Sequence, residues 1–182
     1  MAGLLICSDI HGDAVSAKAV LDAFARYGAE KLIILGDILY HGPRNDLPEG
    51  YAPKKVIELL NPYRDKILAV RGNCEAEVDQ MVLSFPVLAD YAFIERDGLR
   101  LFATHGHVFN KNSIPPLVSG DILLHGHTHV PVAEEFGDGF YYVNPGSTSI
   151  PKENSPKSYI YYENRCFSFR TLEGEEYKRF EI

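Results

Sequence analysis

Residues 4–9 read LLICSD, a short apolar run that ends in a serine and an aspartate. Two later stretches have the same form, KLIILGD at residues 31–37 and KILAVRGN at residues 66–73. Runs of this length and composition are typical of buried strands. We interpret all three as core strands, each of which ends in glycine, aspartate or asparagine.

Helix-like patterns separate these runs. Apolar side chains recur at helical spacing within residues 14–27, where Asp13 is the expected N-cap. Pro53 is expected to open a second helix that continues to Leu60, because proline suits the first helical turn. Alternating strands and helices predict a parallel sheet with right-handed crossovers. Such sheets bind their ligands at the C-terminal ends of the strands.

The second half of the chain has a different character. Residues 92–106 predict a hairpin that turns at Asp97 and Gly98, and residues 134–147 and 158–172 predict two more. DILLHGHTH, at residues 121–129, reads as another buried strand with a polar end. These strands need a partner layer, so we expect an α/β fold with two packed sheets and helices outside. Residues 41–53 form a long loop after a strand end, where loops often carry function.

Length and composition limit the class of protein. The chain has 182 residues, which predicts a single domain over residues 1–182. A formal charge of −7 argues against general nucleic-acid binding, and no apolar run approaches the ~18 residues needed to span a bilayer. Three cysteines without an export signal predict reduced thiols in the cytoplasm. The sequence leaves the oligomeric state open, including a homo-oligomer.

Metal-binding residue types follow five of the apolar runs. They are Asp9 and His11, Asp37, Asn73, His105 and His107, and His127 and His129. Each of these motifs alone is usually a turn or a structural histidine. Five together, each bracketed by a glycine that allows a tight turn, predict a shared metal site.

In this order the motifs D-x-H, G-D, G-N, T-H-G-H and G-H-T-H resemble the calcineurin-like metallophosphoesterases. The resemblance runs from Asp9 to Ser147. The small size of the chain and the segments GDILYHGPRN, RGNCE and NPGS are similar to the YfcE-type phosphodiesterases. The resemblance implies a four-layer α-β-β-α sandwich with two packed mixed sheets.

The resemblance also implies two divalent metal ions per chain. One ion would take Asp9, His11 and His129, the other would take Asn73, His105 and His127, and Asp37 would bridge them. Mixed carboxylate, amide and imidazole ligands suit manganese, zinc, iron, cobalt or nickel, and the family favours manganese. Two carboxylates against two divalent ions leave a charge of about +2, which attracts phosphate despite the acidic chain. For Asn73, a left-handed turn is the alternative to a ligand role.

Fewer observations support the remaining site residues. We expect catalytic roles for Asp37, Asn73, His105 and Cys74, and substrate contacts from Arg44, His107 and Cys74. Arg44 is alternatively a solvated loop residue, and His107 alternatively orients a ligand. The wider superfamily has histidine where this chain has Cys74, and that histidine is thought to protonate the leaving oxygen. Cys74 alternatively only fills space.

The function implied is a metal-dependent phosphodiesterase that acts on small phosphodiester or nucleotide-like substrates. A hydroxide bridging the two metals would attack phosphorus in line. A phosphomonoesterase or a dinucleotide polyphosphate hydrolase is the close alternative. A non-catalytic scaffold, as in the retromer subunit that shares this fold, would be favoured by lost ligands. All seven ligand positions here carry competent residues.

Overall fold

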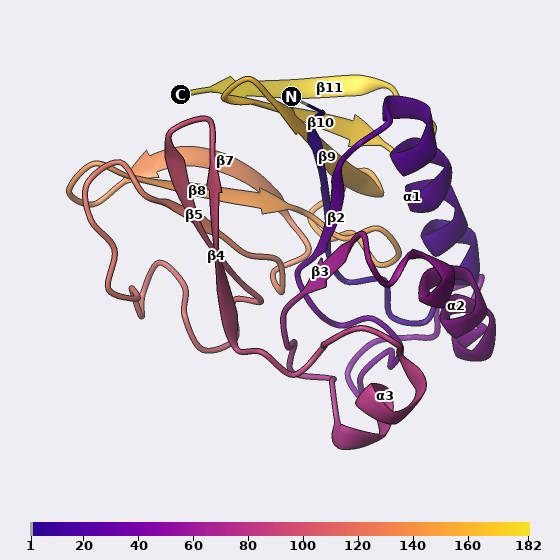
Figure 1. Ribbon diagram of the computed structural model, residues 1–182. Helices are drawn as coiled ribbons and strands as arrows, with labels where there is room; N and C mark the ends of the chain where they lie inside the picture. Colours follow the sequence, from indigo (N-terminus) through magenta and orange to yellow (C-terminus); the bar gives the residue numbers. More distant parts are fainter. Residues whose placement is uncertain (1) are drawn as a thin grey trace.

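The computed structural model describes residues 2–182 and contains two β-sheets that lie face to face (Figure 1). The first sheet has the strand order β11-β10-β9-β1-β2-β3, with bounds β1 Leu4–Cys7, β2 Lys31–Ile34, β3 Ile67–Ala69, β9 Ser158–Glu163, β10 Cys166–Thr171 and β11 Glu176–Glu181. The second has the order β4-β5-β6-β8-β7, with bounds β4 Tyr91–Arg96, β5 Leu99–Thr104, β6 Ile122–Leu124, β7 Pro131–Phe136 and β8 Phe140–Pro145.

The first three strands are apolar except for Lys31 at the start of β2, and both faces of their sheet are covered. In β1, Leu5 and Cys7 belong to the core beneath the helices, and Leu4 and Ile6 belong to the core between the two sheets. Strands β1, β2 and β3 are parallel, as the sequence predicted, so their C-terminal ends lie at one edge. Burial on both faces explains the missing alternation of polar and apolar residues.

The helices α1 (Ala14–Tyr27) and α2 (Pro53–Leu60) cover the outer face of the first sheet (Figure 1). Asp13 caps α1 as predicted, since its Oδ1 accepts hydrogen bonds from the backbone N–H groups of Val15 and Ser16. Pro53 opens α2 in the predicted first-turn position. Among residues 2–182, every helix is too short or too polar to cross a membrane.

The second sheet is mixed. The four-layer sandwich implied helices on its outer face, but an irregular segment lies there instead. The three predicted hairpins are present as β4–β5, β7–β8 and β9–β10. Strands β5 and β6 are parallel, yet residues 105–121 connect them without a helix. Phe109 and Lys111 of this connection contact outward-facing rings of Phe102 and Tyr142. The predicted α/β class with two packed mixed sheets is confirmed, and the outermost layer over the second sheet is irregular.

Two described elements gave no clear signal in the sequence. The helix α3 (Glu77–Val82) has no buried side chain, so it lacks an apolar face that a pattern could reveal. Strand β11 is an edge strand rich in charged residues, and charges on an edge strand oppose pairing with other chains.

Candidate metal centre

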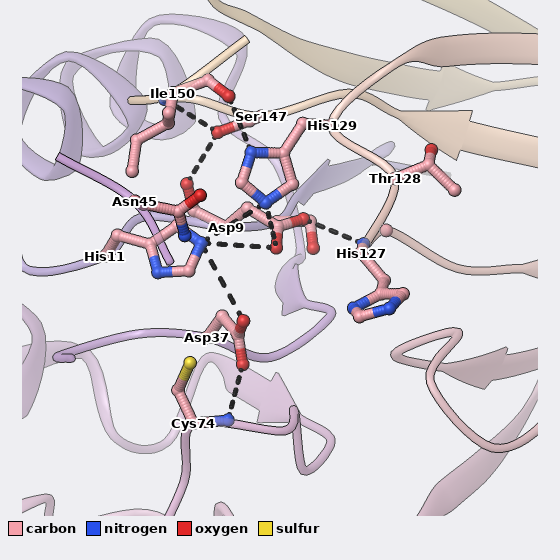
Figure 2. A network of polar contacts seen from close by, with 12 residues as sticks. Asp9, His11, Asp37, Asn45, Cys74, His127, Thr128, His129, Ser147 and Ile150 are labelled. Atoms are coloured by element: carbon pink, nitrogen blue, oxygen red, sulfur yellow. Dashed lines mark hydrogen bonds and ion pairs between the residues drawn. The ribbon is translucent and has the colours of Figure 1, made fainter. Parts of the chain in front are cut away.

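All seven predicted ligands lie in the turns that follow strand ends, at the edge where the two sheets meet. Loops after strands of the first sheet carry Asp9, His11, Asp37 and Asn73, and loops after β5 and β6 carry His105, His127 and His129. Figure 2 shows side chains from both sheets converging on one centre. Neither sheet alone supplies a complete set of ligands.

Three of these residues form the buried ligand group, defined as Asp9, His11 and His129. The Nε2 atoms of His11 and His129 lie 3.5 and 3.3 Å from Asp9 Oδ1, and 3.4 Å from each other. Two atoms bound to one metal at about 2.1 Å lie roughly 3.0–3.5 Å apart in octahedral or tetrahedral geometry. The separations within the group therefore fit a single ion.

Three more residues form the open ligand group, defined as Asn73, His105 and His127. Its members approach at His105 Nε2, which lies 3.2 Å from both Asn73 Oδ1 and His127 Nδ1. Asn73 is not among the residues with positive φ, so the left-handed-turn alternative is wrong. Its amide oxygen faces His105 Nε2, and the two separations of 3.2 Å fit ligands of one ion.

Asp37 lies between the two groups. Its Oδ2 is 3.7 Å from His11 Nε2 and 3.5 Å from His105 Nε2. Its Oδ1 accepts a hydrogen bond of 2.9 Å from the Cys74 backbone N–H, which leaves Oδ2 for the centre (Figure 2). The same carboxylate oxygen therefore faces both ligand groups.

The backbone at these turns is strained. Five predicted ligands have a positive φ, which only glycine adopts freely: Asp9 (55°), His11 (48°), Asp37 (54°), His127 (66°) and His129 (62°). Such strain persists only where the surrounding structure imposes it, and it concentrates at functional sites. The fold therefore holds these side chains at the centre against their local preference.

Backbone carbonyls set the tautomers of three histidines. The Nδ1 atoms of His11, His105 and His129 lie 2.8, 2.6 and 2.6 Å from the carbonyl oxygens of Tyr40, Leu35 and Ile150, respectively. An Nδ1–H that donates to a carbonyl leaves Nε2 with a lone pair directed at the centre. Asp9 Oδ1 is also buried there, with no hydrogen-bond partner in residues 2–182. The Nε2 lone pairs and Asp9 Oδ1 are all acceptors directed at one point, and a bound divalent cation there would satisfy them.

The carboxylates create a negative field that raises the pKa of His11 and His105, whereas burial lowers the pKa of His127 to about 4. Burial alone would lower the pKa of His105, but Asp37 and the charge of Asp9 raise it to about 9. Burial would likewise raise the pKa of Asp9, yet the imidazoles of His11 and His129, whose Nε2 atoms lie 3.5 and 3.3 Å from its Oδ1, hold it well below its ordinary value. The centre favours positive charge, which a proton or a metal ion supplies.

Glu75 is a positioning residue whose role the sequence did not reveal. Its carboxylate accepts hydrogen bonds from the backbone N–H groups of Asp37 (2.9 Å), Ile38 (2.7 Å) and Gly72 (2.5 Å). Burial, and then repulsion from Asp37, raises the pKa of Glu75 to about 7. A Cβ at Gly72 would lie 2.1 Å from Asp37 Oδ1, so only glycine allows this approach. Glu75 thus joins the two loops that carry Asp37 and Asn73.

The NPGS segment, residues 144–147, supports the loops that carry the site. Asn144 Nδ2 donates to the Gly126 carbonyl and to Thr128 Oγ1, both at 2.9 Å, which braces the loop between His127 and His129. The Ser147 hydroxyl donates to the Asp9 carbonyl at 2.8 Å (Figure 2). The segment therefore fixes loops of both sheets.

A cleft of about 410 Å³ lies over the centre. Arg44 lines it together with Asp37, Asn73, His127 and His129, and so does Lys152, which sequence analysis missed. Lys152 is brought there by the backbone, since its N–H donates to the His129 carbonyl at 3.2 Å. His107 instead lines a neighbouring cavity of about 270 Å³ that shares His127. Arg44 and Lys152 are therefore placed to contact an anion bound at the centre.

Comparisons with known proteins give consistent matches. Residues 3–165 match the calcineurin-like phosphoesterase superfamily domain. The chain is 50% identical to the phosphodiesterase YfcE of Escherichia coli strain K12, across 96% of this chain and 95% of the relative. It superposes on the structure of the YfcE phosphoesterase from E. coli with a TM-score of 0.95 and 48% identity, covering 99% of both chains. A solved archaeal phosphodiesterase shares the fold, with a TM-score of 0.61 and 21% identity over 99% of both chains.

Proposed function

This chain belongs to the calcineurin-like phosphoesterase superfamily, and we propose that it is a metal-dependent phosphodiesterase acting on small phosphodiester or nucleotide-like substrates. One observation carries the proposal. The Oδ2 atom of Asp37 faces His11 on one side and His105 on the other, at 3.7 and 3.5 Å. A carboxylate shared in this way supports two adjacent metal ions.

The buried ligand group would hold one divalent ion and the open ligand group the other, with Asp37 common to both. Imidazole, carboxylate and amide donors together suit manganese, our first choice, and also zinc, iron, cobalt or nickel. When bound, such ions supply an activated water as nucleophile and stabilise negative charge on phosphorus oxygens. The tautomers fixed by Tyr40, Leu35 and Ile150 keep three Nε2 atoms available as ligands.

Other side chains would bind and orient the substrate. Arg44 and Lys152 lie on the cleft and would pair with the non-bridging phosphate oxygens, Arg44 through two parallel hydrogen bonds. His107 would contact a substituent of the substrate from its neighbouring cavity. Both sheets contribute ligands, which supports a single domain as the functional unit.

The direct test is to remove and restore the metal. Protein stripped by a chelator should lose hydrolysis of an aryl phosphodiester and regain it on addition of manganese. Elemental analysis of the stripped protein should find no bound metal. Unchanged activity in verified metal-free protein would contradict the proposal. A parallel series of monoesters and dinucleotide polyphosphates decides between phosphodiesterase and the two alternative hydrolases.

A further inference from the structure

An apolar pocket of about 440 Å³ lies beside the metal centre, between the loop after β2, the start of α2 and α3. Its lining is apolar or aromatic except for Lys54 and Asp79. The Asp79 carboxylate is already engaged, because it accepts a hydrogen bond of 2.7 Å from the Ala76 backbone N–H at the start of α3. The pocket therefore offers mainly apolar surface to a ligand. We call it the apolar pocket.

Cys74 connects the apolar pocket to the metal centre. Cys74 lines the pocket, and its Sγ lies within 4.8 Å of ligand atoms of His11 and Asp37. The loop after β2 passes over the thiol at Gly42, where a Cβ would lie 3.4 Å from the sulfur. One residue thus lines the pocket and stands next to two of the predicted ligands. The apolar pocket therefore begins next to the position that a bound phosphate would take at the centre.

Aromatic rings form one side of the apolar pocket. Tyr40 and Tyr51 line it, and the His41 ring lies edge-on to both, with centroid distances of 4.7 and 5.3 Å. Tyr40 is 43% exposed and Val78 is 60% exposed, so the apolar surface at this site is in contact with water. A planar aromatic ligand would cover this surface and add ring contacts.

We propose that the apolar pocket binds an aromatic or heteroaromatic ester substituent of the substrate, attached close to the phosphate. This inference rests on the proposed function, because it requires the phosphate to sit at the metal centre. The volume lies within the range of about 300–1,000 Å³ typical of small-molecule sites. A sugar-like or charged substituent would lose its water there and find few polar partners, which is unfavourable.

The test compares two phosphonates that are not hydrolysed. Phenylphosphonate and methylphosphonate present the same anionic head to the centre and differ only in the substituent. Isothermal titration of manganese-loaded protein should show that phenylphosphonate binds about tenfold to a hundredfold more tightly, the gain expected from burying a ring. The readout is binding, so it does not depend on turnover.

Two variants on the same helix assign the effect to the pocket. Val78→Asp places a charge in the lining and should reduce the ratio of the two affinities to near one. Met81→Asp is the matched control, since Met81 lies on α3 with 83% exposure outside the pocket, and it should leave the ratio unchanged. Methylphosphonate should bind all three proteins equally, which shows an intact centre.

The outcomes separate the pocket from the proposed function. Equal affinities for the two phosphonates in the unaltered protein would overturn the proposal that the apolar pocket binds the aromatic substituent. A ratio that Val78→Asp leaves unchanged would do the same. Neither result would contradict the proposed metal centre. Failure of the loaded protein to bind either phosphonate would overturn the proposed function and the inference with it.

Discussion

The two ligand groups use similar donors but differ in their access to solvent. In the buried group, Asp9, His11 and His129 are 0%, 1% and 3% exposed. In the open group, His105 is buried, His127 is half-buried and Asn73 is exposed. Backbone carbonyls orient the two histidines of the buried group, and the hydroxyls of Ser147 and Ser149 donate hydrogen bonds to the Asp9 carbonyl. We therefore expect the buried group to hold a divalent ion more tightly and the open group to face the substrate.

The largest effect is expected where the two groups meet. Asp37→Asn removes the shared charge but keeps an oxygen that accepts from the Cys74 N–H, so the fold should survive. Losing a ligand common to both ions should lower the rate of phosphodiester hydrolysis by about 10³-fold or more. Elemental analysis should also find less bound metal. Full occupancy of both sites with a normal rate would contradict the assignment of Asp37 as a ligand shared by the two groups.

A smaller effect should distinguish the groups themselves. Asn73→Ala removes an exposed amide ligand and should weaken one metal-binding step by about tenfold to a hundredfold, leaving the other step unchanged. His11→Ala removes a buried ligand and should weaken the tighter step more strongly. Manganese titration against a competing chelator resolves the two steps. If both variants weakened the same step, the assignment of separate groups would be wrong.

The sequence predicted most of what local chemistry decides. The family, the fold class and the class of enzyme are confirmed. Polar residues that end apolar runs, such as Asp9 and Asn73, could be placed together because parallel strands end at one edge. The roles of individual residues, manganese as the metal and a cytoplasmic location stay predictions.

Contacts between distant segments could not be predicted. Lys152 reaches the cleft because a backbone hydrogen bond ties it to His129, a pairing without a local signal. The carbonyls of Leu35 and Ile150 orient histidines far away in the sequence, and any residue type supplies a carbonyl. His107 shows the converse, since its motif predicted the region correctly but the cavity it lines is a neighbouring one.

Cys74 lies beside Asp37 and contacts residues of both ligand groups, which bears on how the centre serves catalysis. Asn73 Nδ2 donates to its sulfur at 3.3 Å, and its backbone N–H donates to Asp37. In the metal-free protein, burial and then the Asp37 charge raise the pKa of the thiol. A thiol of raised pKa is a poor proton donor, and a thiolate formed beside bound metal would have no proton to give.

The smallest expected effect follows from this weak donor. General acid catalysis is typically worth about 10²–10⁴ in rate and matters most for strongly basic leaving groups. The enzyme should therefore prefer aryl or nucleotide esters to alkyl esters. Cys74→His supplies an acid and should speed alkyl cleavage more than aryl cleavage, flattening the dependence of rate on leaving-group pKa. An equal change across a matched series of esters would mean that Cys74 only fills space between the metal centre and the apolar pocket.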